Sequence, residues 1–131
     1  MKKSEKQILI IEDEPDIQEL LSFNLDNNGY KVYIASNGEK GLEVARKEHP
    51  DLILLDLMLP GIHGLDVCRI IKSDLETSGI SIIMLTALGQ DEDIIKGLET
   101  GAADYVTKPF SLQVLEARIK SVLRRLSLIH I

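Results

Sequence analysis

Three acidic residues follow two apolar runs of strand length in this sequence. Glu12 and Asp13 come directly after the run at 8–11, and Asp56 comes directly after the run at 52–55. If these runs form neighbouring parallel strands, their carboxyl ends bring the three carboxylates to one point at the edge of the sheet. Carboxylates held that close raise one another's pKa and destabilise the charged forms. The pattern therefore indicates a site for a hard divalent cation or for a shared proton.

Two further side chains with suitable chemistry stand at the ends of later apolar runs. Thr86 closes the run at 82–86, and Lys108 follows the short run at 105–107. A phosphoryl group is transferred readily when its oxygens contact a divalent cation, a fixed positive charge and a hydrogen-bond donor. The sequence provides ligands for Mg²⁺, the charge of Lys108 and the hydroxyl of Thr86. A carboxylate becomes the nucleophile when an aspartyl phosphate is the intermediate, and Asp56 is the candidate.

The elements that must position these residues alternate along the chain. Apolar runs of strand length are separated by segments with helical periodicity, which is typical of repeated βα units and a parallel sheet. We expect five strands, near 7–11, 31–35, 51–56, 80–85 and 104–107. We expect five helices, near 15–28, 38–48, 64–75, 91–100 and 111–126. The sequence thus predicts a single α/β domain of (βα)5 type, with a doubly wound five-stranded parallel sheet.

Length and composition limit the alternatives. A chain of 131 residues suits one domain, and no apolar stretch reaches the length of a membrane span. The formal charge of −6 argues against nucleic acid binding by this chain, because phosphate contacts need a basic surface. The short apolar run near the start ends in acidic residues and does not make a signal peptide, so we expect a cytoplasmic protein without a membrane partner. Cys68 is the only cysteine, and we expect it to be a small buried hydrophobe.

Together these residues resemble the receiver domain of a bacterial two-component response regulator, and the resemblance extends from Lys6 to Arg125. That family implies a flavodoxin-like sheet with strand order 2-1-3-4-5, in a receiver domain at 1–126 followed by a linker or tail at 127–131. It implies a sensor histidine kinase as the phosphoryl donor. It does not imply a turnover enzyme, since such a domain catalyses only its own phosphorylation and dephosphorylation.

The same resemblance assigns the acidic residues. It makes Asp56 the phosphoacceptor and Mg²⁺ the cofactor, with Mn²⁺ able to replace it. The implied oxygen ligands of the metal are Glu12, Asp13, Asp56 and the backbone carbonyl of Met58. Glu12 is expected to act through a water molecule.

The resemblance also assigns the later strand ends. It makes Thr86 the switch hydroxyl, Tyr105 the aromatic switch and Lys108 the lysine that binds the phosphoryl group. It implies a cis peptide bond before Pro109, an isomer that only an X-Pro bond adopts at small cost. Taken alone, Tyr105 also fits simple packing within a short strand.

Within this family, residues 97–105 and the basic residues of 117–125 are similar to the OmpR/PhoB class of transcription factors. The class implies a homodimer that forms on phosphorylation, through the fourth helix, the fifth strand and the fifth helix. The interface residues that it implies are the ion pairs Asp104 with Arg118 and Glu99 with Lys120, and the apolar pair Ile95 and Leu98. DNA binding would come only from an output domain that is not in this sequence. A receiver that acts on another protein without a DNA output stays open, and a solvated basic face on the fifth helix is the plain alternative to the dimer.

Three features depart from that class. Ala103 stands where a second aspartate is usual, which leaves Arg125 without its expected partner. Ile94 and Val114 replace a charged pair, and Glu116 stands where a small or apolar residue is usual. We expect an interface with fewer ion pairs and more apolar contact, and therefore one that is less sensitive to salt.

Two other functions share parts of this pattern. An aspartyl-phosphate hydrolase of the haloacid dehalogenase type needs a second aspartate two residues after the nucleophile, where Met58 stands. A flavodoxin-like carrier needs a first loop that accepts flavin phosphate, whereas residues 12–14 are all acidic. His63, in the loop at 61–64, is not expected to bind a metal or carry a phosphoryl group. The receiver function is therefore favoured over both.

Two apolar side chains bear on how long a phosphoryl group would last. The positions best placed to orient a hydrolytic water are two residues after the acceptor and two after the switch threonine, here Met58 and Leu88. Neither side chain hydrogen-bonds water strongly. We therefore expect slow self-dephosphorylation, over hours rather than seconds.

Overall fold

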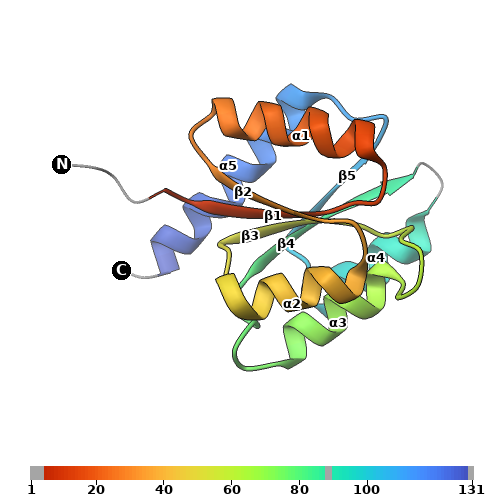
Figure 1. The fold of residues 1–131 in the computed structure, drawn as a ribbon. Coiled ribbons are helices and arrows are strands. Elements are labelled where there is room, and N and C mark those ends of the chain that lie inside the picture. The colour runs from red at the N-terminus through yellow and green to blue at the C-terminus, as the bar shows by residue number, and fades with distance from the viewer. Residues whose placement is uncertain (1–4, 88–89, 130–131) are drawn as a thin grey trace.

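Ten elements alternate along the described residues, 5–87 and 90–129, of the computed structural model (Figure 1). The strands are β1 (Gln7–Ile11), β2 (Lys31–Ala35), β3 (Leu52–Asp56), β4 (Ser81–Ala87) and β5 (Asp104–Lys108). The helices are α1 (Pro15–Asn27), α2 (Gly38–Glu48), α3 (Gly64–Ser73), α4 (Asp91–Thr100) and α5 (Leu112–Ile129).

The strands form one sheet in the order β2-β1-β3-β4-β5, and every neighbouring pair is parallel. Helices α1 and α5 cover one face of this sheet, and α2, α3 and α4 cover the other (Figure 1). The predicted doubly wound fold and its strand order are confirmed. None of the helices in the described ranges combines the length and the apolar character that a membrane span needs.

The fourth strand is longer than its apolar run predicts. β4 continues to Ala87 instead of ending at 85, because Thr86 and Ala87 lie opposite Thr107 and Lys108 of β5 in the parallel ladder. Thr86 is therefore held inside a paired strand. This pairing fixes the height of the Thr86 side chain relative to the end of β5.

Two helix ends also differ from the expected ones. α3 ends at Ser73 rather than at 75, because Asp74 has an extended backbone and opens the turn before β4. α5 ends at Ile129 rather than at 126, so residues 127–129 are helical. The division of the chain into a receiver domain at 1–126 and a tail at 127–131 stays a prediction.

Both faces of the sheet are buried, which explains why its central strands are apolar almost throughout. Ile8 and Ile10 of β1 pack with residues of α1 and α5. Leu9 and Ile11 alternate with them and pack with residues of α2 and α3, where Cys68 is fully buried as expected. The two cores hold the strands in place, so the residues at their carboxyl ends have fixed positions.

The start of α3 lies directly against the end of β3. A Cβ atom at Gly64 would lie 2.5 Å from Leu57 Cα and 2.6 Å from the Asp56 carbonyl oxygen, so only glycine fits there. His63 caps the helix, because its Nδ1 accepts a hydrogen bond from the Leu65 N–H at 3.0 Å. This close approach fixes the loop that follows Asp56.

Candidate functional site

Glu12, Asp13 and Asp56 lie together at the carboxyl edge of the sheet, as the sequence predicts. β1 and β3 are parallel neighbours with Ile11 opposite Leu55, so the residues that follow them are adjacent. One carboxylate oxygen from each of the three residues lies within 4.8 Å of the other two. Glu12 is fully buried, Asp56 is 2% exposed and Asp13 is exposed.

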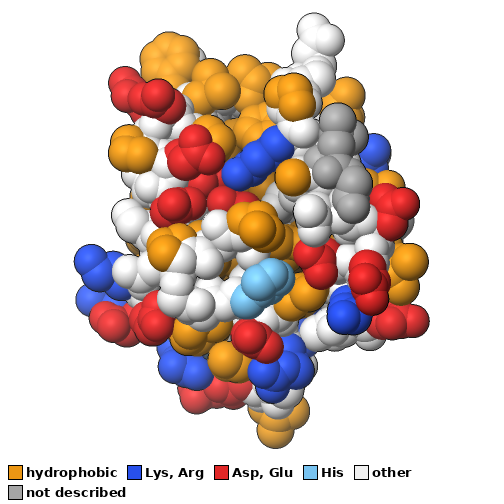
Figure 2. All heavy atoms as spheres, turned by 90° about the vertical axis from the view of Figure 1, so that its right-hand side faces the viewer, with side chains coloured by type: hydrophobic (Ala, Val, Ile, Leu, Met, Phe, Trp, Pro, Cys, Tyr) orange, Lys and Arg blue, Asp and Glu red, His pale blue; other side chains and the backbone are white. Residues whose placement is uncertain are grey.

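Lys108, the last residue of β5, supplies positive charge to this cluster. Its ammonium Nζ lies 3.0 Å from Glu12 Oε1 and 3.2 Å from Asp56 Oδ2. Charge-assisted hydrogen bonds of this length are stronger than neutral ones. The peptide bond from Lys108 to Pro109 is cis. Figure 2, which faces the carboxyl edge of the sheet, shows several acidic side chains beside a basic one in its upper half.

Glu12 is held by further contacts from its own loop and from α1. Its Oε2 accepts a hydrogen bond from the Glu14 N–H at 3.0 Å. Gln18 Nε2 donates to the Glu12 carbonyl oxygen at 2.6 Å and to Ser36 Oγ at 3.2 Å. Gln18 is a supporting residue that the sequence pattern does not single out, because a glutamine in the first turns of a helix suits solvent equally well.

Burial raises the pKa of Glu12 above its ordinary value of 4.5, and the charge of Asp56 raises it further. The Glu14 N–H and Lys108 act in the opposite direction, but burial dominates. Burial alone would lower the pKa of Lys108. The hydrogen bond to Glu12 and the charges of Asp56 and Glu12 outweigh burial and raise this pKa above 10.5. Lys108 is therefore firmly protonated beside carboxylates that it does not fully neutralise.

The donor set fits a hard divalent cation. Three carboxylates face a single ammonium, so the cluster keeps an excess of negative charge. Mg²⁺ prefers carboxylate and carbonyl oxygens over softer ligands. Glu12, Asp13 and Asp56 therefore could hold a metal ion at this edge of the sheet.

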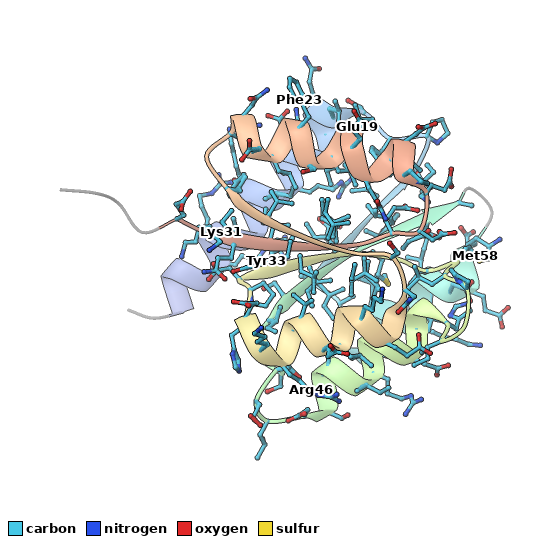
Figure 3. All side chains as sticks on the ribbon, in the orientation of Figure 1. Glu19, Phe23, Lys31, Tyr33, Arg46 and Met58 are labelled. Atoms are coloured by element: carbon cyan, nitrogen blue, oxygen red, sulfur yellow. The ribbon has the colours of Figure 1, made fainter. Side chains whose placement is uncertain are left out.

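Asp56 is also tied to the loop that follows it. Its Oδ1 accepts a hydrogen bond from the Met58 N–H at 3.0 Å, while Oδ2 faces Lys108. The Met58 side chain is 59% exposed and lies at the carboxyl edge of the sheet (Figure 3). Each oxygen of the Asp56 carboxylate thus has its own donor. Leu88, the other residue expected to affect dephosphorylation, lies outside the described residues.

Thr86 and Tyr105 lie on the neighbouring strands β4 and β5. Thr86 is 1% exposed, and its Oγ1 donates to the Ala87 carbonyl oxygen at 3.4 Å, a long and weak hydrogen bond. Tyr105 is half-buried, and the centre of its ring lies 5.9 Å from the guanidinium carbon of Arg118. The hydroxyl of Thr86 is thus weakly held, and the ring of Tyr105 is in contact with α5.

The expected pair of Asp104 and Arg118 forms within one chain. Arg118 Nη1 lies 3.1 Å from both carboxylate oxygens of Asp104. The two residues are neighbours because β5 packs beside α5. The pair that the class resemblance places across a dimer interface is therefore an intramolecular pair in the single chain.

The other expected interface residues lie on the surface. Ile95 and Leu98 of α4 are 55% and 41% exposed, and Glu99 and Lys120 are exposed as well. Glu116, which departs from the class pattern, accepts a hydrogen bond from an asparagine of α1 at 3.3 Å. Its carboxylate therefore contacts α1 rather than α4.

Comparison with known protein families matches residues 8–120 to the response regulator receiver domain. A putative response regulator from Chloroflexus aurantiacus has a similar solved structure, with a TM-score of 0.88 and 37% sequence identity. The similarity covers 92% of this chain and 99% of that one.

Two curated relatives are named as transcriptional regulators. The DNA-binding dual master transcriptional regulator RpaA of Synechocystis is 49% identical over 119 residues, which are 91% of this chain and 49% of RpaA. The phosphate regulon transcriptional regulatory protein PhoB of Escherichia coli is 46% identical over 122 residues, which are 93% of this chain and 53% of PhoB. The chain thus spans about half the length of the curated relatives it matches.

Replacement of Lys108 by methionine should destabilise the metal-free protein by about 1–3 kcal/mol at neutral pH, because two buried carboxylates lose their ammonium partner. The pKa of Glu12 is already raised above 4.5, and loss of Lys108 raises it further. A carboxyl group whose pKa is higher in the folded protein than in the unfolded one holds its proton more tightly when folded. It therefore stabilises the fold at pH values below its unfolded pKa, and this contribution is lost as the pH rises through its folded pKa. The difference in the free energy of unfolding between the original protein and the Lys108 variant should therefore grow as the pH rises above 4.5. Urea unfolding in a chelating buffer measures it.

Lys40→Met is the matched control, since it removes the same charge from an exposed position of α2. It should change the free energy of unfolding by less than about 0.5 kcal/mol. Equal effects of the two substitutions would contradict the role given to Lys108.

Proposed function

The chain belongs to the response regulator receiver domain family, and we propose that it accepts a phosphoryl group on Asp56 from the phosphohistidine of a sensor histidine kinase. The observation that carries this proposal is the position of Asp56, 3.2 Å from the Lys108 ammonium and beside two further carboxylates. Such a carboxylate combines a nucleophile, a fixed positive charge and a cation site.

Asp56 attacks phosphorus in line with the P–N bond of the phosphohistidine, so a P–O bond forms as the P–N bond breaks and histidine leaves. The Met58 N–H holds the attacking carboxylate in one orientation. Lys108, which lies 3.2 Å from Asp56 Oδ2, would turn to the phosphoryl oxygens and offset their developing negative charge. Mg²⁺, or Mn²⁺ in its place, would neutralise those oxygens and would be held by Glu12, Asp13, Asp56 and the Met58 carbonyl.

The acyl phosphate then biases a switch that leads to the surface. The Thr86 hydroxyl leaves its weak bond with the Ala87 carbonyl and donates to a phosphoryl oxygen. An inward turn of Tyr105 withdraws its ring from Arg118, which is also the partner of Asp104. This change frees charged groups on the surface of α4, β5 and α5 to contact a second copy of the chain. Phosphorylation thus shifts a pre-existing equilibrium toward the form that dimerises.

We infer that the output is control of transcription by a homodimer. The curated relatives named as transcriptional regulators are about twice as long as this chain. Contact with DNA would therefore come from a separate output domain. The formal charge of this chain, −6, agrees with DNA binding by a separate domain, because an acidic surface repels phosphates.

Replacement of Asp56 by asparagine should reduce phosphoryl uptake by at least ~10³-fold, as loss of a covalent nucleophile does. Radioactive acetyl phosphate with Mg²⁺ serves as the donor, and the label on the protein is counted. Asp26→Asn, which changes an exposed aspartate at the end of α1, is the control and should label normally. Full labelling of the Asp56 variant would refute the assignment of the acceptor.

Beryllofluoride with Mg²⁺, which mimics an acyl phosphate, should double the molecular mass of the protein in solution, as measured by light scattering. Ile95→Glu should abolish the increase, because it puts a charge into the apolar patch of α4. Leu75, between α3 and β4, is 94% exposed, and Leu75→Glu should leave the increase unchanged. An unchanged mass with beryllofluoride would rule out the dimer and leave the acceptor assignment standing.

The phosphorylated protein should keep its label for hours, because the side chain two residues after the acceptor is apolar. Met58→Asn supplies an amide that orients water, and it should speed the loss about 3- to 10-fold, less than the ~10²-fold of a positioned general base. Leu75→Asn is the control for an exposed apolar residue elsewhere. Loss of label from the original protein within seconds would contradict this prediction.

A further inference from the structure

We propose that Met58 is an oxidation site through which peroxides shorten the lifetime of the aspartyl phosphate, an inference that rests on the proposed function of Asp56. Met58 is 59% exposed, whereas Met84, the other methionine in the described ranges, is fully buried. A peroxide therefore reaches the Met58 sulfur in the folded protein. Oxidation of Met84 would require the core to open.

The single cysteine does not compete for the oxidant. Cys68 is fully buried between α3 and the sheet. Burial also raises the pKa of its thiol above 9.0, so the reactive thiolate is scarce. Among the described residues, Met58 is the sulfur that solvent reaches.

The backbone of Met58 places the start of this side chain beside Asp56. Its N–H donates to Asp56 Oδ1 at 3.0 Å, so the Met58 side chain begins beside the carboxylate that would carry the phosphoryl group. Figure 3 shows Met58 at the carboxyl edge of the sheet, at the end of β3. A change in the polarity of this side chain therefore acts on the water around Asp56.

The chemical step is a two-electron oxygen transfer. The sulfur lone pair of Met58 attacks one oxygen of a peroxide, ROOH, and an S–O bond forms as the O–O bond breaks. The sulfur is oxidised to the sulfoxide, and the peroxide is reduced to ROH. Methionine sulfoxide reductases reverse the change at the expense of thiols, so the modification can be switched off.

Oxidation to the sulfoxide gives residue 58 a strong hydrogen-bond acceptor, which the thioether of methionine lacks. A thioether is a weak hydrogen-bond acceptor, and it leaves a neighbouring water unoriented. The sulfoxide oxygen is polar and accepts a hydrogen bond from water, which can then be directed at phosphorus. Oxidation should therefore resemble Met58→Asn in its effect on dephosphorylation. Signal output would fall under peroxide stress, without any change in the kinase.

The test uses the whole chain treated with dilute hydrogen peroxide and digested for mass spectrometry, which locates each added oxygen atom. Treated and untreated protein are then labelled with radioactive acetyl phosphate and Mg²⁺, and loss of the label is followed. We expect oxygen on Met58 and not on Met84, and loss that is about 3- to 10-fold faster after treatment, below the ~10²-fold of a general base. Methionine sulfoxide reductase should restore the slow loss.

Met58→Leu is the matched variant, and each preparation is compared with its own rate before peroxide. The leucine variant should show no response to peroxide. Equal rates in oxidised and unoxidised protein, or modification of Met84 or Cys68 with Met58 intact, would overturn the inference alone. Failure of the untreated protein to take up label would overturn the proposed function. The two outcomes can be distinguished, because mass spectrometry locates the added oxygen atoms in protein that has not been phosphorylated.

Discussion

The site depends on a crowding of like charges that the sheet enforces. Glu12 and Asp56 are buried carboxylates at the carboxyl ends of neighbouring strands, and one ammonium, that of Lys108, lies within 3.2 Å of both. Burial favours the neutral form of Glu12 and raises its pKa, yet Lys108 stays protonated. The two apolar cores, one on each face, keep the strand ends in place against this repulsion. The stability of the fold thus holds together an unfavourable cluster of carboxylates whose repulsion a bound cation would relieve.

The groups around Asp56 differ in how firmly they are held. The Asp56 carboxylate has a donor at each oxygen. The absence of a side chain at Gly64 lets the start of α3 pack closely against the backbone of Asp56 and Leu57. Thr86 has only a long hydrogen bond at 3.4 Å. A firmly held carboxylate beside a weakly held hydroxyl suits the proposed switch, because Asp56 would have to stay in place while Thr86 moves. The paired length of β4 fixes the backbone of Thr86 and leaves its side chain to move.

Most of the fold could be predicted from the sequence, because strands buried on both faces are apolar runs and parallel strands meet at one edge. Glu12, Asp13, Asp56 and Lys108 come together for that reason. The remaining details depend on pairing and packing that a local pattern does not contain. The ladder with β5 extends β4 to Ala87, and Gln18 contacts the Glu12 carbonyl only once α1 is docked. The link between Asp104 and Arg118 within one chain likewise follows from the packing of α5 beside β5.

That internal pair has a consequence for any dimer built on this surface. If Arg118 leaves Asp104 of its own chain to pair with Asp104 of another, one half-buried ion pair replaces a similar one. The net change in free energy is then small, on the order of 1 kcal/mol or less. Exchange of partners therefore orients the two copies without adding much affinity. The affinity must come from apolar area, and Ile95, Leu98 and Val114 are 55%, 41% and 44% exposed. In such a dimer, Val114, which departs from the class pattern, would add apolar area to Ile95 and Leu98, and the charged residues would determine the geometry of the interface.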